Sequence, residues 1–372
     1  MHKSWLTGLL VAATSACALM EPGLAKAESP ATYKVGAVIR DIVPEKPTYW
    51  RGAKTHALIT SVWYPATADS VETPFLIGPP DAPFFNAAEF AHDAKLSQAS
   101  ERYPLIVISH GTGGSAAQMA WLGTALAAHG YIVAAVNHPG NNSLEPYTVE
   151  GFSVWWERAN DLTGVIDAML QDSTFGPRID ARKIGAAGFS LGGYTMIAIA
   201  GGITEPHRIV DFCASPQADD ACKPTPEFPN FWDKAQQQLK TDVDMQAAFR
   251  DAGKSHRDPR IRAVFAIAPA LGPVFPTDTL KAVTIPVEIV AGDGDHIVPV
   301  NTNASYFAAN IPNAKLTILP GGVGHYTFLA ACTDAGRRVL AEICTDDKGV
   351  DRASVHKDVG KRAIAFFESN LN

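Results

Sequence analysis

The chain has 372 residues, of which 47% are hydrophobic and 19% are charged, so it can bury a large core and has the composition of a folded protein. Its formal net charge is −7 and its lysines and arginines form no basic block, which argues against nucleic acid or an anionic membrane surface as the main partner. The length permits two domains, but chains of alternating strands and helices often spend this many residues on one.

The first 27 residues have the pattern of an export signal. A short basic start precedes an apolar run from Leu6 to Met20, and Ala-Lys-Ala at 25–27 has the form of a cleavage site. The run is shorter than the roughly 20 residues that a membrane span needs. We therefore expect a cleaved secretory signal at 1–27, an exported protein in the periplasm or the medium, and no stable membrane insertion. A retained N-terminal anchor and a lipoprotein acylated at Cys17 are the alternatives.

After this signal, apolar runs of strand and helix type alternate. Two strand-like runs come first, at 33–43 and 56–64, and a loop rich in Pro, Phe and Ala is expected at 74–90. Six further apolar runs lack polar alternation, as in strands buried on both faces of a parallel sheet. These six runs are 105–109, 132–136, 184–188, 263–267, 287–291 and 316–319.

Helices are expected between these strands, at 116–129, 155–170, 191–200 and 355–371. The alternation predicts βαβ units and thus an α/β fold with a doubly wound, mostly parallel sheet and helices on both faces. We expect a single domain over 28–372.

The alternation breaks once, at about 203–259. This insertion is rich in proline, carries one pair of cysteines, and contains a polar helical run from Asp233 to Arg250. An insertion at the C-terminal edge of such a sheet lies over the crevice where ligands bind. We expect a cap over the binding site, and a surface loop without function is the alternative.

Four cysteines follow the signal, in two pairs that are close in sequence: Cys213 with Cys222 and Cys332 with Cys344. Four cysteines allow three pairings. In an oxidising compartment we expect the local pairing, which closes two short loops, and four free thiols are the alternative.

The strongest local motif is Gly-Phe-Ser-Leu-Gly at 188–192, which has the form G-x-S-x-G. An apolar strand leads into it and a helix leads out, and in that context the motif forms a sharp turn that exposes the serine hydroxyl. Ser190 is therefore the expected nucleophile, and a serine that merely caps the helix is the alternative.

A serine hydroxyl needs a base, and the base needs an acid that orients it. With this motif the three follow in the order Ser, Asp, His, on loops after later strands. His325 follows the last strand and is the expected base. Asp293 and Asp295 both follow the strand at 287–291; we favour Asp295 as the acid and expect Asp293 to bond to its own turn. His296 is expected at the edge of the site or on the surface.

Attack on a carbonyl creates an oxyanion, which waiting backbone amides must stabilise. The expected donors are the amide of Leu191, directly after the nucleophile, and that of Thr112 in the loop Ser-His-Gly-Thr-Gly-Gly at 109–114. A phosphate-binding loop is excluded because no Gly-Lys-Ser/Thr follows. We expect His110 to brace this loop, and His138 either to line the site or to bond to its own turn.

These motifs resemble those of the α/β-hydrolases known as predicted dienelactone hydrolases, close to the platelet-activating-factor acetylhydrolase-like esterases. The resemblance covers most of the chain after the signal and implies the α/β-hydrolase fold, the triad Ser190, Asp295 and His325, and neither metal nor cofactor. Dienelactone hydrolases proper use a cysteine where this chain has Ser190, so a lactone substrate is not implied. The segments that carry the resemblance are 62–66, 109–114, 127–134, 137–141, 188–193 and 258–261.

The sequence thus predicts an exported serine esterase that forms an acyl-enzyme on Ser190. Its substrate is expected to be a small-molecule, lipid or polyester ester. The polar helical run in the insertion has little apolar face for a lipid droplet, which favours short acyl groups of about two to six carbons. An amidase or peptidase on the same triad and a non-catalytic binding protein are the alternatives. No feature of the sequence indicates an oligomeric state.

Overall fold

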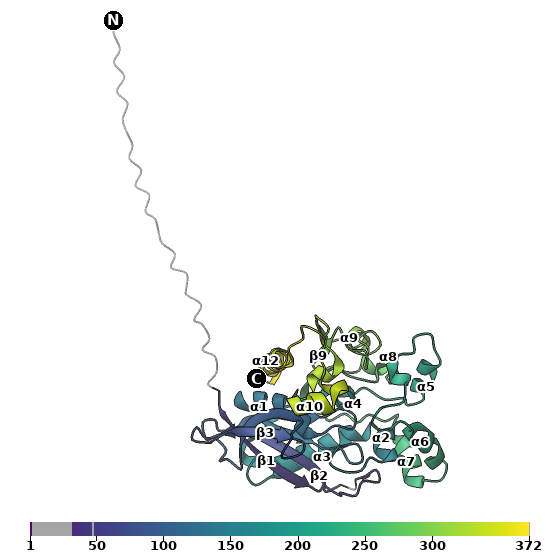
Figure 1. Ribbon diagram of the computed structural model, residues 1–372, viewed down its shortest axis with the longest axis horizontal. Helices are drawn as coiled ribbons and strands as arrows, with labels where there is room; N and C mark the ends of the chain where they lie inside the picture. The colour runs from purple at the N-terminus through teal and green to yellow at the C-terminus, as the bar shows by residue number, and fades with distance from the viewer. Residues whose placement is uncertain (2–31, 47, 372) are drawn as a thin grey trace. The chain divides into compact units, whose positions relative to one another are not determined.

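The computed structural model describes Met1, residues 32–46 and residues 48–371 (Figure 1). Apart from Met1, the expected signal at 1–27 lies outside the described residues. The elements below belong to the unit that begins at Thr32. None of its described helices is long and apolar enough to cross a membrane.

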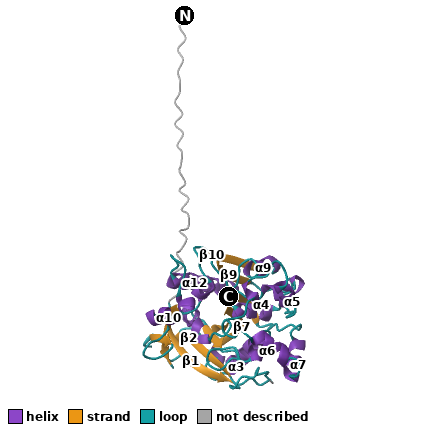
Figure 2. Ribbon diagram, turned by 45° about the vertical axis from the view of Figure 1, so that its right-hand side comes forward, coloured by secondary structure: helices purple, strands orange, loops and turns teal. Residues whose placement is uncertain are grey.

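A mixed, mostly parallel sheet, with 11 strands among the described residues, forms the centre of the fold (Figure 2). The strands from β10 to β6 are parallel to their neighbours, and β2 is antiparallel to both β6 and β1. The expected doubly wound α/β sheet is thereby confirmed. The spatial order is β10 (Ala314–Leu319), β9 (Val287–Gly292), β8 (Ile261–Ile267), β7 (Ile179–Phe189), β5 (Tyr103–Ser109), β6 (Ile132–Val136), β2 (Leu58–Ala66), β1 (Lys34–Ile42), β4 (Phe85–His92) and β11 (Ala331–Cys332), with β3 (Thr73–Ile77) paired to β4.

The inner strands are apolar on both faces because helices cover both faces. In β5, Leu105 and Val107 pack into one core, whereas Ile106 and Ile108 pack into the other. Each of these four side chains is 0% exposed, which explains why the strand shows no polar alternation. The first core is closed by α3 (Glu157–Gln171), α4 (Leu191–Ala200) and α9 (Ala304–Asn310), and the second by α1 (Ala120–Ala128) and α12 (Arg352–Leu371).

The prediction of a loop at 74–90 is wrong, because this segment contains most of β3 and most of β4. In β4 the buried Phe85 and Ala87 alternate with the exposed Asn86, and the rings of Phe75 and Phe90 lie 5.0 Å apart across the two strands. The density of proline and small residues concealed this period of two in the sequence.

The polar helical run expected at 233–250 is two helices, α6 (Phe231–Gln238) and α7 (Val243–Asp251). The side chain of Asp242 accepts a hydrogen bond from the Met245 amide and so caps the start of α7. The run expected at 116–129 begins as a 3₁₀ turn, η1 (Ala116–Met119), before α1. The other short helices are α2 (Val149–Ser153), η2 (Gly176–Arg178), α5 (Arg208–Cys213), η3 (Asp220–Cys222), η4 (Gly272–Val274), α8 (Thr277–Leu280), η5 (His325–Phe328), α10 (Asp334–Val339) and α11 (Ala341–Cys344).

Both disulfides have the expected local pairing. Cys213 at the end of α5 is bonded to Cys222 in η3, with a Cα–Cα distance of 5.4 Å. Cys332 in β11 is bonded to Cys344 in α11, with a Cα–Cα distance of 5.7 Å. The first disulfide therefore links α5 to η3 within the N-terminal half of the insertion.

Candidate active site

Ser190 lies in a strained turn between β7 and α4. Its backbone has φ 58° and ψ −118°, a region that residues other than glycine rarely adopt. The flanking glycines make room for this turn. A Cβ on Gly192 would lie 1.9 Å from the Ser109 carbonyl oxygen, and one on Gly188 would lie 2.2 Å from that of Gly192. The G-x-S-x-G motif therefore has the strand–turn–helix context that the sequence predicts.

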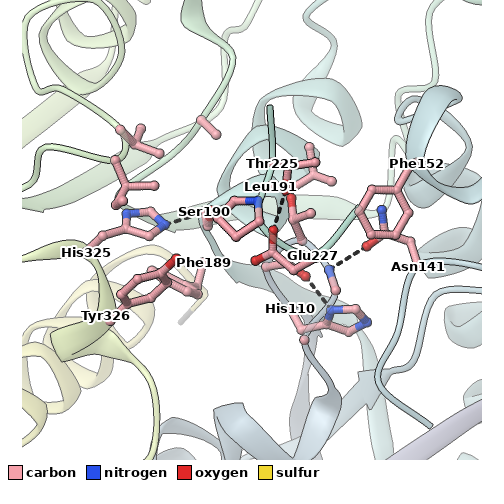
Figure 3. Close-up of a pocket in the computed structure, with 18 of the residues that line it drawn as sticks. His110, Asn141, Phe152, Phe189, Ser190, Leu191, Thr225, Glu227, His325 and Tyr326 are labelled. Atoms are coloured by element: carbon pink, nitrogen blue, oxygen red, sulfur yellow. Dashed lines mark hydrogen bonds between the residues drawn. The ribbon is translucent and has the colours of Figure 1, made fainter. Parts of the chain in front are cut away.

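Ser190, His325 and Asp295 form a continuous hydrogen-bonded relay. The Nε2 atom of His325 lies 2.9 Å from Ser190 Oγ (Figure 3), and its Nδ1 atom lies 2.7 Å from Asp295 Oδ2. Because a carboxylate oxygen only accepts, Nδ1 carries the proton, and Nε2 is left to accept the proton of the serine. The three residues are 8%, 5% and 4% exposed, respectively.

The two aspartates after β9 have different partners. Asp295 also accepts a hydrogen bond from the Val298 amide through its second oxygen, at 2.7 Å. Asp293 instead accepts from the amides of Gly321 and Gly322, at 3.0 and 2.8 Å. The expectation that Asp293 bonds to its own turn is therefore wrong, since it holds the loop that leads to His325.

The loop at 109–114 passes directly beside the serine. A Cβ on Gly111 would lie 3.2 Å from Ser190 Cβ, and the Gly113 amide donates to the Asn141 side chain at 2.7 Å (Figure 3). Across the described part of the chain, no acceptor is bonded to the Thr112 amide. Leu191 is the first residue of α4, where amides lack a partner within the helix.

A cavity of about 470 Å³ opens over Ser190 and His325. Thr112 and Leu191 lie in its wall, which also includes the aromatic side chains of Phe152, Trp155 and Phe189. The insertion contributes Ile209, Asp220, Ala221, Lys223, Pro224, Thr225, Pro226, Glu227, Phe231 and Trp232. His296 is exposed and lies outside this lining.

His138 does not have either of the roles expected for it. It is 0% exposed and does not line the cavity. Its Nε2 atom lies 2.8 Å from Ser109 Oγ, and its Nδ1 atom lies 2.7 Å from the Asp161 carboxylate. His110, as expected, braces the glycine-rich loop, because its Nδ1 donates to the Gly111 carbonyl at 2.7 Å.

Three buried charged residues behind this loop were not identified from the sequence: Arg51, Arg158 and Asp161. Arg51 bonds to Asp161 at 2.6 Å, and Arg158 donates to the carbonyl of His110 at 2.7 Å. Arg158 lies four positions before the buried Leu162 and seven before Val165, on the stripe of α3 that faces the core. A charge on that stripe was the signal available in the sequence.

Burial and the nearby Arg158 guanidinium hold the pKa of His110 and that of His138 well below the ordinary histidine value. Both imidazoles are therefore neutral at pH 7. Burial, together with Arg51, lowers the pKa of Arg158 to about 9, so its guanidinium remains charged at that pH. Among the described residues, no cluster of His, Cys, Asp or Glu is arranged to hold a metal ion.

The family model for platelet-activating factor acetylhydrolase, isoform II, matches residues 86–153, which include the glycine-rich loop. Cutinase est1 of Thermobifida alba is 34% identical over 100 residues, which cover 26% of this chain and 30% of that protein. Cutinase cut1 of Thermobifida fusca is 31% identical over 100 residues, which cover 26% of this chain and 28% of that protein. The chain thus matches less than a third of the length of these relatives.

A ferulic acid esterase from Streptomyces cinnamoneus superimposes with a TM-score of 0.59 at 18% identity, over 92% of both chains. This likeness shows the fold. The chain therefore has the α/β-hydrolase fold. The predicted resemblance to platelet-activating-factor acetylhydrolase-like esterases is confirmed over residues 86–153, which that family model matches.

Proposed function

We propose that the protein is a serine carboxylic-ester hydrolase. The observation that carries this proposal is the relay from Asp295 through His325 to Ser190, at 2.7 and 2.9 Å, whose histidine and serine line a cavity. The names of the relatives, two cutinases and a ferulic acid esterase, favour an ester over an amide as the substrate. A binding protein on a hydrolase scaffold has no need of all three residues in this geometry.

In the proposed reaction, Ser190 Oγ attacks the ester carbonyl carbon while its proton passes to His325 Nε2. The negative charge that develops on the carbonyl oxygen is stabilised by the amides of Thr112 and Leu191, and Asp295 stabilises the imidazolium. When the intermediate collapses, His325 protonates the departing alkoxide and an acyl-enzyme remains on Ser190. Water, activated by His325, then releases the acid by the same steps.

We propose short-acyl esters, of about two to six carbons, as the preferred substrates. The insertion contributes part of the cavity wall and acts in this proposal as a cap held by the disulfide between Cys213 and Cys222. In α6, Phe231 and Ala235 are buried, whereas its exposed positions are polar. Such a helix presents little apolar surface to a lipid aggregate.

We also propose that the protein is exported. The two disulfides are typical of an oxidising compartment and rare in the cytosol. This agrees with the signal expected at 1–27.

The test compares p-nitrophenyl butyrate with the p-nitroanilide of butyrate, using the native protein and Ser190→Ala. We expect the ester to be hydrolysed far faster, and the variant to lose on the order of 10⁴-fold or more in kcat while it remains folded. Faster hydrolysis of the anilide would indicate an amidase. Equal activity of the variant would refute the assignment of Ser190. A series of acyl chains checks the substrate proposal, which fails if emulsified long-chain triglycerides react faster than the butyrate.

A further inference from the structure

A buried cluster of ionisable side chains lies behind the glycine-rich loop and takes no part in the proposed proton relay. It consists of Arg51, His110, His138, Arg158 and Asp161, none of which is more than 3% exposed. Burying such groups costs free energy even when they are paired, and replacing them with apolar residues is often neutral. Packing alone therefore does not account for this cluster.

The cluster converges on the carbonyl oxygen of Gly111. His110 Nδ1 donates to it at 2.7 Å, and the Nη2 atom of Arg158 donates at 3.3 Å. The Gly114 amide also donates to it, at 3.3 Å. The Nη1 atom of Arg158 donates to the preceding carbonyl, that of His110, at 2.7 Å. The guanidinium fork thus holds two successive carbonyls of the loop.

The Gly111 carbonyl and the Thr112 amide belong to one peptide unit. No cis peptide bond occurs among the described residues, so in this unit the N–H and the C=O point in opposite directions. The donors of the buried cluster hold the Gly111 carbonyl toward the cluster. They therefore turn the Thr112 N–H away from the cluster. A carbonyl that accepts hydrogen bonds also polarises its own peptide unit, which makes the N–H a stronger donor.

The tautomer of His110 is fixed by its neighbour. The backbone amide of His138 donates to His110 Nε2 at 3.1 Å, so Nε2 is the acceptor and the proton lies on Nδ1, which faces Gly111. The ring of His138 is held in turn between Ser109 and Asp161. The contacts therefore run without a break from Asp161 to the carbonyl of Gly111.

We propose that Arg158 and His110 are positioning residues that hold the Thr112 amide in the orientation required to bind the oxyanion. Arg158 also places a buried positive charge behind that amide. Both act through the peptide unit between Gly111 and Thr112 and not on the substrate itself. The inference rests on the proposed function, because it requires that an oxyanion forms when Ser190 attacks.

The test replaces Arg158 by Met and by Lys and uses Arg352→Met as the control. Arg352 is a matched residue, since it is 7% exposed and also donates to two carbonyls, those of Ala330 and Ile343. Loss of one oxyanion donor lowers kcat by roughly 10²–10³-fold in other serine hydrolases. We expect a fall of about 10²-fold in kcat for Arg158→Met, with KM changed by less than about threefold. Arg158→Lys should fall between this variant and the native protein, because it keeps the charge but loses the fork.

A second readout separates positioning from general damage to the fold. A trifluoromethyl ketone forms a tetrahedral oxyanion adduct on a serine nucleophile, whereas KM reports largely on the uncharged substrate. We expect the affinity for the ketone to fall in parallel with kcat in Arg158→Met and to stay unchanged in Arg352→Met. If both arginine variants have the same kcat, or if Arg158→Met alters KM alone, the inference is overturned.

His110 provides variants that test the same idea should Arg158→Met fail to fold. Asn at this position can place its amide N–H near Nδ1 and keep the bond to Gly111, whereas Gln places its carboxamide near Nε2 and loses that bond. We expect kcat of His110→Asn to exceed that of His110→Gln by about tenfold, on the order of one hydrogen bond. Equal kcat values for His110→Asn and His110→Gln would overturn the proposed role of His110. If native protein and Ser190→Ala are equally inactive, the proposed function fails instead.

Discussion

Two aspartates on one loop give a matched pair of variants, Asp295→Asn and Asp293→Asn. In the native protein, the two oxygens of Asp295 accept from the Val298 amide and from His325 Nδ1, both at 2.7 Å. An asparagine has only one oxygen. If that oxygen keeps the bond to the Val298 amide, the side-chain NH₂ group of the asparagine faces His325. This group can only donate, so Nδ1 of His325 must then be an acceptor. The proton then moves to Nε2, which can no longer accept the proton of Ser190.

The expected magnitude follows from this change of tautomer. A carboxylate-to-amide change in a serine triad with intact geometry lowers kcat by about 10⁴-fold, or about 5.5 kcal/mol of transition-state stabilisation. Asp293→Asn instead replaces one of two acceptors for the amides of Gly321 and Gly322. Losing one such bond costs about 1–2 kcal/mol of folding free energy and leaves the relay intact.

The assay is kcat for p-nitrophenyl butyrate, together with urea unfolding for each variant. We expect Asp295→Asn to be nearly inactive and Asp293→Asn to keep kcat within about threefold of native while it unfolds at lower urea. The reasoning is refuted if Asp293→Asn loses as much kcat as Asp295→Asn, or if Asp295→Asn stays within about tenfold of native.

Three further predictions concern stability and selectivity. Replacing Cys213 and Cys222 by serine removes a disulfide that closes a loop with a sequence separation of 9. The free energy of unfolding, measured with urea, should fall by about 2–3 kcal/mol, and a fall of less than about 1 kcal/mol contradicts this prediction. Glu227 lines the cavity, and its carboxylate accepts a hydrogen bond from the Thr225 hydroxyl but forms no ion pair among the described residues. Glu227→Gln should therefore raise kcat/KM for an anionic nitrophenyl ester relative to a neutral one by roughly tenfold at low salt, and an unchanged ratio contradicts this. Burial lowers the pKa of His356 to about 4, so the unfolded chain binds a proton below pH 6.5 that the folded protein does not. Stability should fall between pH 6.5 and 4 by about 2 kcal/mol more in the native protein than in His356→Gln, and parallel pH profiles contradict this.

The sequence predicted the inner sheet well because strands buried on both faces appear as unbroken apolar runs. The segment at 74–90 was missed because no residue of β3 is fully buried, and β4 alternates buried and exposed positions only over Phe85–Ala87, so prolines and small residues concealed the pattern. The division between α6 and α7 depended on a cap at Asp242, which is one polar residue among many in that run.

The structure brings together the three residues that the sequence predicts as the triad, Ser190, His325 and Asp295, because each follows a strand whose C-terminal end lies at the same edge of the sheet. The sequence did not identify the cluster around Arg158, because the one local signal was a charge on the core-facing stripe of α3, and the partners that explain this charge are distant in the chain. Arg51 and Asp161, for example, are separated by 110 positions and yet lie 2.6 Å apart. Such pairs have no signature in local spacing.

The central claim, that Ser190 is an activated nucleophile, is tested most directly by labelling the folded protein with a fluorophosphonate probe and mapping the modified peptide by mass spectrometry. We predict stoichiometric labelling of Ser190, with esterase activity lost in proportion, and no labelling of Ser190→Ala or of denatured protein. Esterase activity that survives full labelling of Ser190, or a label that forms on a different residue as activity is lost, would contradict the account.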